Sequence, residues 1–390
     1  MKWHYRNTVL VLCAFAFFAT YYARVAFSPV VPFITDEFAV SNTQIGIALS
    51  GMWIAYGLTQ YPSGILADAF GEKRIILLSV GGTAVLSLLT AVAPVFVVFF
   101  VGVVGVGAAA GLHYTVASTL LSRTYDDIGT AIGLHSLGAP VAGLVAPIAS
   151  AWIGVRYGWR PAIAVVVLVA LPIFVIFLWR VHPTEPRHAD RESDARATVG
   201  LFFSFLSRPT TAFFTVISIL ATFAINGLIS FLPTFLVEYH GYSLTLAGVA
   251  FSGFFIARGG IQILIGAVSD RYDRDIAIVA SLLSGTFGLA LFLVGPGLLP
   301  ILVGVLLFGG GASFFAAVEP KMLASLTEAE KNAGFGVFRT TYMVGGSTGS
   351  IGVGAFADLL GWAATMLILV ALFTTALGLV VANRLFGFGY

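Results

Sequence analysis

Three arginines lie within long apolar stretches of the sequence, away from any loop: Arg24, Arg258 and Arg339. A charged side chain in the middle of a membrane-spanning helix costs about 3 kcal/mol or more, so it is expected to face the protein interior and to be functional. The planar guanidinium group donates paired hydrogen bonds that match a carboxylate or a phosphate. The three arginines therefore indicate a binding site for a small organic anion.

Helical spacing gives each of these arginines a polar or aromatic neighbour. Residues three or four positions apart share one face of an α-helix. These neighbours are candidate substrate-binding residues. They are Tyr21 for Arg24, Gln262 for Arg258, and Tyr342 for Arg339.

Acidic partners for the three arginines are scarce in the apolar stretches, where only Glu319 stands clear of the predicted loops. One carboxylate cannot neutralise three guanidinium groups, so a surplus of positive charge is left for a bound anion. The alternative is that the arginines bind backbone carbonyls or Glu319 and serve only in packing or gating.

Proton coupling has three candidate residues, His113, His135 and Glu319. A neutral histidine is tolerated inside a helix bundle, and its side chain titrates near physiological pH. A proton could therefore travel with the anion on one of these groups. Each histidine has the alternative role of a hydrogen-bonded packing residue.

The composition shows which elements must position these residues. Hydrophobic residues make up 58% of the chain and charged residues 10%, against about 25% charged in a soluble domain. The sequence therefore predicts an integral membrane protein with the lipid bilayer as its partner. The sequence has no basic tract of the kind that binds nucleic acid. Its single cysteine, Cys13, rules out an intramolecular disulfide. There is no metal-ligand spacing, nucleotide loop or GxSxG motif, so we expect no enzyme, metal, cofactor or ATP.

Apolar runs of about 20 residues, long enough to cross a bilayer, occur twelve times. We expect an all-α membrane protein, with six helices in residues 1–181, a cytoplasmic linker over 182–208, and six helices in 209–390. Ser41 is the expected N-cap of the second helix. The predicted helices are 8–35, 42–67, 74–92, 94–122, 128–155, 161–181, 209–237, 244–269, 275–294, 298–323, 333–358 and 362–384.

The second half of the chain repeats the first at a nearly constant offset. Gly64 and Gly266, like Asp68 and Asp270, are 202 residues apart, and the two Gly-Trp pairs at 158 and 361 are 203 apart. Parallel repeats of this kind occur in secondary transporters, with substrate bound near the membrane midplane between the halves. The offset aligns Arg24 with Asn226, and Tyr56 with Arg258. We therefore add Tyr56 and Asn226 to the predicted substrate site.

Basic residues collect on one side of the predicted bundle. The termini, the loop at 64–74 and the linker carry most of the Lys and Arg residues, whereas the opposite loops carry only Arg156 and Arg160. By the positive-inside rule, both termini are cytoplasmic. We expect a multi-pass protein of the cell membrane.

The polar segment GILADAFGEKR, from Gly64 to Arg74, separates two apolar runs, and a weaker copy, GAVSDRYDR, begins at Gly266. The first segment resembles the loop between helices 2 and 3 of the major facilitator superfamily of secondary transporters, although Ala69 stands where the family usually has a base. The resemblance implies two pseudo-symmetric six-helix bundles that work by alternating access. It also implies a cytoplasmic gating motif, for which the alternative is that the charges only end and orient helices. The residues of this motif are Gly64, Asp68, Gly71, Lys73, Arg74, Asp270 and Arg271.

The arginine positions also resemble those of particular carriers. An arginine in the eighth helix with a base in the eleventh is similar to transporters of oxalate, formate and monocarboxylates, and an arginine in the first helix is similar to organic-phosphate symporters. We expect a monomeric transporter of a small organic anion, with a proton as the candidate coupling ion.

Two other functions are open. Drug or metabolite efflux by proton antiport is one: GAPVAG at 138–143 resembles part of an antiporter motif, but Val101 stands where antiporters have an arginine. A membrane sensor is the other, and it would need a signalling domain for which the linker is too short.

Overall fold

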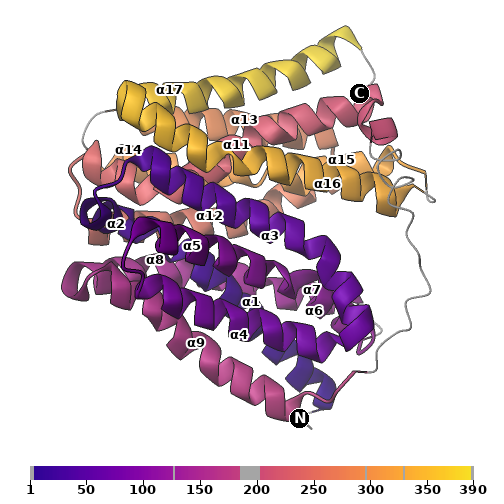
Figure 1. Ribbon diagram of the computed structural model, residues 1–390. Coiled ribbons are helices and arrows are strands. Elements are labelled where there is room, and N and C mark those ends of the chain that lie inside the picture. Colours follow the sequence, from indigo (N-terminus) through magenta and orange to yellow (C-terminus); the bar gives the residue numbers. More distant parts are fainter. Residues whose placement is uncertain (1–3, 126–127, 185–202, 295–296, 328–329, 388–390) are drawn as a thin grey trace. The chain divides into compact units, whose positions relative to one another are not determined.

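The computed structural model describes residues 4–125, 128–184, 203–294, 297–327 and 330–387, with the side chains of Tyr61 and residues 331–333 left out. Throughout these ranges the regular structure is helical (Figure 1). The chain divides into two compact units, residues 1–192 and 193–390, called here the N half and the C half. The middle of the predicted linker, with Arg187, Arg191 and Arg196, lies outside the described residues, as does Lys2.

The helices of the N half form six membrane-crossing segments. Three of these segments consist of two consecutive helical pieces. In chain order the elements are α1 (Tyr5–Val25), the 3-10 turn η1 (Ser28–Val30), α2 (Val31–Phe38), α3 (Asn42–Phe70), α4 (Glu72–Ala91), α5 (Phe96–Gly111), α6 (His113–Ser122), α7 (Ile128–Ser136), α8 (Gly138–Tyr157) and α9 (Trp159–Arg180).

The C half has the same plan. Its last helix, α17, runs from the second part of the eleventh crossing through the twelfth, and within it only Gly361 has non-helical backbone angles. The elements are α11 (Pro209–Glu238), α12 (Leu244–Arg271), α13 (Arg274–Leu291), α14 (Leu298–Ala312), α15 (Phe315–Ala324), α16 (Lys331–Ser347) and α17 (Gly349–Phe386).

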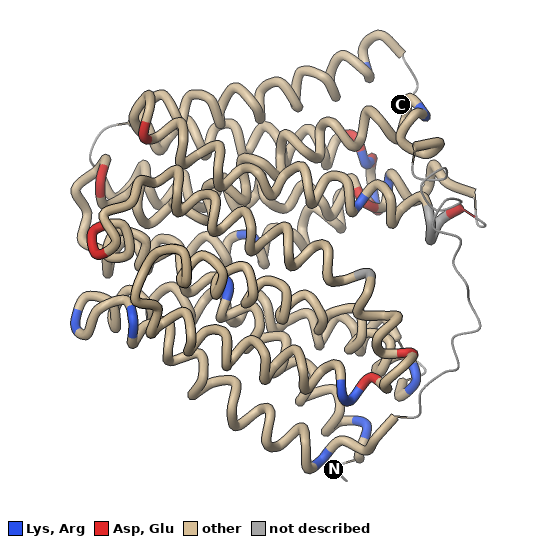
Figure 2. Tube along the Cα trace, in the orientation of Figure 1, with Lys and Arg blue, Asp and Glu red and all other residues tan. Residues whose placement is uncertain are grey.

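Ten stretches of the described chain are long and apolar enough to cross a membrane. The last of them, residues 334–386, contains both the eleventh and the twelfth crossing, and the 29-residue helix α3 supplies the second. The fold is therefore the twelve-helix membrane fold expected from the sequence. Figure 2 shows most charged residues at the ends of the helices, with isolated basic positions midway along them.

The predicted bounds of the crossings agree with these stretches, but five of the crossings consist of more than one helical piece, which the sequence did not indicate. The first breaks at η1, where Pro29 and Pro32 lack the amide N–H that would continue the helix. The others break at Leu112, Leu137, Ser313 and Thr348, where the helix tightens for one turn with a hydrogen bond to the residue three positions back. By contrast, the predicted cap at Ser41 is confirmed: its hydroxyl accepts from the Gln44 amide in a capping box.

Both halves repeat the same helix pairings, which is the structural form of the repeat. In the N half α1 packs on α8, α3 on α5, and α4 on α5 and α9. In the C half the equivalent pairs are α11 with α17, α12 with α14, and α13 with α14 and α17.

Small residues allow these helices to approach closely. A Cβ atom at Gly107 would lie 2.1 Å from the Met52 carbonyl oxygen, and one at Gly138 would lie 2.5 Å from that of Ala14. The glycines of α5, and the first glycine of GAPVAG in α8, are therefore packing positions between helices.

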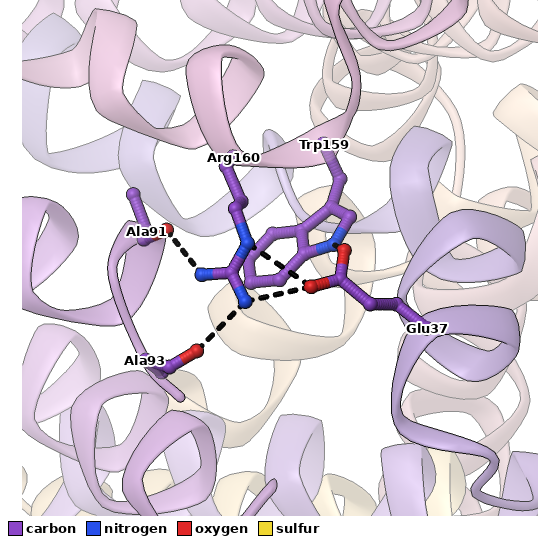
Figure 3. A network of polar contacts seen from close by, with 5 residues as sticks. All are labelled: Glu37, Ala91, Ala93, Trp159 and Arg160. Atoms are coloured by element: carbon purple, nitrogen blue, oxygen red, sulfur yellow. Dashed lines mark hydrogen bonds and ion pairs between the residues drawn. The ribbon is translucent and has the colours of Figure 1, made fainter. Parts of the chain in front are cut away.

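A polar network fixes one end of the N half (Figure 3). The Trp159 indole N–H donates to Glu37 at 2.6 Å, and Arg160 donates to the other oxygen of the same carboxylate at 2.7 and 3.1 Å. Arg160 also donates to the carbonyls of Ala91 and Ala93, both at 2.8 Å, so the start of α9 is tied to α2 and to the α4–α5 turn. No local pattern in the sequence indicates this network, because Glu37 and Arg160 are 123 positions apart.

The C half contains the counterpart of this contact. Trp362 donates its indole N–H to Glu238 at 2.7 Å. Each tryptophan follows a glycine with positive φ, Gly158 at +86° and Gly361 at +80°. The Gly-Trp pair therefore makes the same turn and the same hydrogen bond in both halves, which gives a physical reason for its recurrence in the sequence.

Ion pairs join helix ends on the predicted cytoplasmic side of each half. Glu72 at the start of α4 pairs with Arg123 after α6 at 2.8 Å, and Asp275 of α13 pairs with Lys321 of α15. In the C half the hydrogen bond from Arg208 lowers the pKa of Glu330 to about 2, so this 2.7 Å pair stays charged at physiological pH.

Candidate functional site

Arg24 occupies a buried aromatic cage in the N half. Its side chain, on α1, is 3% exposed. The guanidinium carbon lies 3.8 Å from the ring centre of Tyr56, 4.8 Å from that of Tyr21 and 5.2 Å from that of Trp53. Cation–π contacts of this kind stabilise a desolvated guanidinium by about 2 kcal/mol. The predicted grouping of Arg24 with Tyr21 and Tyr56 is therefore present within the N half.

The cage leaves the charge of Arg24 uncompensated. Its Nε donates to the Thr20 carbonyl at 3.3 Å, while Nη2 is buried with no hydrogen-bond partner among the described residues. Within the same part of the chain, no carboxylate forms an ion pair with Arg24. An acceptor for a buried N–H is worth about 1–3 kcal/mol, and more when the group is charged. The site therefore favours a ligand that brings a negative oxygen.

The C half groups a second set of predicted residues around Tyr342. This tyrosine is 5% exposed, and its hydroxyl donates to Glu319 at 2.7 Å. Its ring stacks on Phe315 at 4.8 Å. Arg339 and Arg258 are both close enough to Tyr342 to interact with it electrostatically. Helices α12, α15 and α16 therefore bring two arginines and one carboxylate to one tyrosine.

Two predicted substrate residues stand apart from these contacts. Asn226 is half-buried on α11, and Gln262 is exposed on α12. Lys321 of α15 is held by its ion pair with Asp275 of α13. The meeting of Arg24 and Arg258 in one cavity stays a prediction.

The candidate proton groups of the N half form a pair. The Nε2 atoms of His113 and His135 lie 3.1 Å apart, and both side chains are fully buried. The Phe17 ring stacks on both imidazoles, with ring centres 5.9 and 5.1 Å away. The sequence showed two separate histidines, and only the packing of α6 against α7 makes them one group.

The gating motif lies at the α3–α4 turn, where Gly71 has φ +85°. A Cβ atom there would lie 2.4 Å from the Thr184 carbonyl oxygen, so only glycine fits. Lys73 donates its amide to the Thr184 hydroxyl at 3.3 Å and its Nζ to the Leu178 carbonyl at 2.8 Å. Within the N half, these residues hold the end of α9 and the start of the linker.

The remaining motif residues lie at the surface of their own halves. Gly64 and Asp68 are half-buried, and Arg74, Asp270 and Arg271 are exposed. Their predicted role as a latch between the halves stays a prediction.

Sequence reasoning missed two contributors to these sites. Trp53 was not identified, although it precedes Tyr56 by three positions and so shares its helix face. Glu72 was seen only as part of the polar loop, but it is buried and pairs with Arg123. That pairing joins residues 51 positions apart, a separation that no local pattern signals.

Comparisons with known proteins agree with this architecture. The sequence profile described as Major Facilitator Superfamily matches residues 13–252 and 214–386. The 3-(3-hydroxy-phenyl)propionate transporter of Escherichia coli K12 is 31% identical over 300 residues, covering 75% of this chain and 71% of that protein. The phosphoglycerate transporter protein of Salmonella typhimurium is 24% identical over 395 residues, covering 92% and 84%.

Solved structures show the same fold. A bacterial homologue of the human lysosomal transporter Spinster superposes with a TM-score of 0.84 at 17% identity, over 98% of both chains. The sequence profile, the relatives and the two six-helix halves agree: the chain belongs to the Major Facilitator Superfamily of secondary transporters.

Proposed function

We propose that this transporter moves a small organic anion, a carboxylate or an organic phosphate, across the cell membrane by alternating access. The observation that carries the proposal is the buried Arg24 guanidinium, which has an aromatic cage but no carboxylate partner among the described residues. A buried charge without a counterion is strongly destabilising unless a ligand supplies one. A bound anion would supply both the missing charge and the missing acceptor.

The C half supports the same substrate class. Arg258 and Arg339 lie near Tyr342, whereas the single carboxylate of that group, Glu319, already accepts the tyrosine hydroxyl. Two guanidinium groups against one carboxylate leave a net positive site. Guanidinium groups suit carboxylates and phosphates because they donate in pairs.

The relatives support the proposal through their substrates. Hydroxyphenylpropionate carries a carboxylate, and phosphoglycerate carries a carboxylate and a phosphate. The proposal includes a cell-membrane location with both termini in the cytoplasm, and a monomer as the working unit.

A second candidate is efflux of a drug or metabolite by proton antiport. The half-buried Glu319 favours it, because a carboxylate within the membrane can exchange a proton for a substrate. In that case the substrate would be neutral or cationic, and the arginines would contribute little to its binding.

Uptake into liposomes separates the two candidates. Purified protein would be tested with labelled monocarboxylates, dicarboxylates and organic phosphates, with and without a pH gradient. We expect Arg258→Ala to abolish anion uptake while the protein still expresses and folds. Arg156→Ala is the matched control, since Arg156 is an exposed arginine that stacks on Trp152 at a helix end. Wild-type rates from Arg258→Ala would remove the anion proposal.

A further inference from the structure

His113 and His135 lie where two crossings of the N half are interrupted. His113 is the first residue of α6, directly after the break at Leu112. His135 is the next-to-last residue of α7, just before the break at Leu137. A change in the contact between the two rings therefore acts on both breaks at once, and such discontinuities are where transporters place their ion sites.

The distance between the imidazole rings of His113 and His135 determines which of their nitrogens carry protons. At 3.1 Å, one Nε2 must donate and the other must accept, so two neutral rings share a single N–H between them. The ring that donates through Nε2 then has a bare Nδ1, and the other ring carries its proton on Nδ1. The bare Nδ1 is the place where one more proton can bind.

The outer nitrogens of the pair make no hydrogen bond of good geometry within the described residues. Both Nδ1 atoms are buried without a partner of hydrogen-bonding geometry, although the backbone of Cys13 lies beside the His113 ring. An added proton would leave two buried N–H groups in need of an acceptor. The protonated pair is therefore expected to favour a rearrangement at the two helix breaks.

The charges that face the pair come from α1. Arg24 lies over the Tyr21 ring, which is 6.2 Å from the Phe17 ring that stacks on both imidazoles, and the backbone of Cys13 lies beside His113. On α6 itself, the Tyr114 ring lies 5.5 Å from that of His135. Among the described residues, no titratable group of α3, α4, α5 or α8 makes a hydrogen bond, an ion pair or a ring contact with either histidine. The Arg24 guanidinium therefore adds to the cost that burial and the second imidazole set on a proton at His113.

We propose that the His113–His135 pair is the binding site of a co-transported proton, loaded when an organic anion occupies Arg24 in the same half. The anion cancels the repulsion between the Arg24 guanidinium and a protonated imidazole. By linkage, a proton on the pair must raise the affinity for the anion by the same factor. The proton comes from water on the side of entry, forms one N–H bond, and leaves to water on the other side.

This proposal rests on the proposed function and gives it a stoichiometry. One proton with one monoanion carries no net charge across the membrane. Uptake of a monocarboxylate would then respond to a pH gradient and not to a membrane potential.

The repeat shows that the pair belongs to the N half alone. The position 202 residues after His113 is Phe315, which likewise begins a helix after a break, α15. There the ring stacks on Tyr342 and carries no titratable group. The two equivalent breaks therefore carry different side chains. The N half has a pair of titratable histidines there, and the C half has two stacked aromatic rings.

The first test uses the wild-type protein and needs no variant to fold. Purified transporter in weakly buffered detergent solution, with a pH indicator dye, would be mixed with 3-(3-hydroxyphenyl)propionate. We expect about one proton to be taken up for each anion bound. Anion binding without proton uptake would overturn the proposal and leave the proposed function intact.

The second test separates coupling from transport. In liposomes, His113→Gln and His135→Gln should exchange labelled for unlabelled anion but should no longer accumulate it under a pH gradient. The control is His240→Gln, since His240 lies outside the N half, where it hydrogen-bonds the Phe292 carbonyl and packs against the rings of Phe235, Tyr239 and Tyr242. Accumulation at the wild-type level by both pair variants would overturn the proposal. If the wild-type protein neither bound nor exchanged any anion, the proposed function itself would fail.

Discussion

At the scale of single residues, the account depends on how a guanidinium is held without a counterion. Three aromatic rings lie against Arg24 and attract its charge. These contacts do not take up the N–H groups that point outward in the plane of the guanidinium. The arginine is therefore kept charged, fixed in position and open to an acceptor. Fixing a donor before the ligand arrives reduces the entropy cost of binding.

The first prediction concerns the shape of this group as well as its charge. Arg24→Lys keeps the charge but loses the planar pair of donors, and Arg24→Ala loses both. Because a hydrogen bond to a charged group contributes about 1.5–3 kcal/mol, we expect anion uptake to fall about 10-fold to 100-fold in the alanine variant. The lysine variant should lie in between.

Initial uptake rates at several anion concentrations would measure both effects. Elution of each variant as a folded species is the control for stability. A lysine variant with wild-type uptake would show that the planar fork is not required.

At the scale of helices, the turns between them place the strictest demands on residue type. Gly71 holds its turn at a backbone angle that is open essentially to glycine alone, directly against Thr184. Gly64, in the same sequence segment, has open space around its Cβ position. The two glycines of one motif therefore have different physical roles.

The second prediction compares alanine at these two positions. Gly71→Ala should lower stability by about 1–3 kcal/mol from backbone strain, with a further loss from the clash with Thr184. Gly64→Ala should fold normally, since glycine within a helix is less favourable than alanine by about 1 kcal/mol. Thermal unfolding of the two purified variants is the measurement. Equal melting temperatures would contradict the assignment of the turn.

The helices also show how much of the fold could be predicted from the sequence. The crossings, the repeat and the Ser41 cap were predicted because each depends on local composition, spacing or a short motif. The breaks at Leu112 and Leu137 were not predicted, because the glycines beside them, Gly111 and Gly138, are two of several glycines in these crossings, and tertiary packing decides where the helix is interrupted. Arg160 was assigned to an outer loop as a topology signal, and its network with Glu37 depends on residues 123 positions away.

The candidate functional site could likewise be predicted only in part from the sequence. Helix phase correctly placed Tyr21 beside Arg24, and the repeat offset led to Tyr56, which contacts the same arginine. The sequence could not join His113 to His135, since each lies on its own helix with 21 residues between them. Pairing across helices is a property of the fold, and no periodicity within one helix contains it.

At the scale of the whole molecule, the distribution of basic residues predicts the orientation. The positive-inside rule places both termini and the α12–α13 turn in the cytoplasm. The turn around Gly361 would then face the outside. Tyr272 and Leu359, both 80% exposed, are suitable reporters for the two sides.

The third prediction tests this orientation by labelling. Single cysteines would be placed at Tyr272 or Leu359 in a Cys13→Ser background, since Cys13 is the only native cysteine and is buried. A membrane-impermeant maleimide should label Leu359→Cys in intact cells and Tyr272→Cys only after lysis. The reverse pattern would invert the topology.

The need for a negative charge on the substrate is tested most directly by comparing a carboxylic acid with its uncharged methyl ester. Binding of 3-(3-hydroxyphenyl)propionate and of its methyl ester to the purified transporter would be measured by titration calorimetry. The two molecules have nearly the same shape, but only the acid can pair with a guanidinium. We expect the acid to bind, and the ester to bind at least about tenfold more weakly, the factor that corresponds to 1.4 kcal/mol. Equal affinity for acid and ester would contradict this expectation.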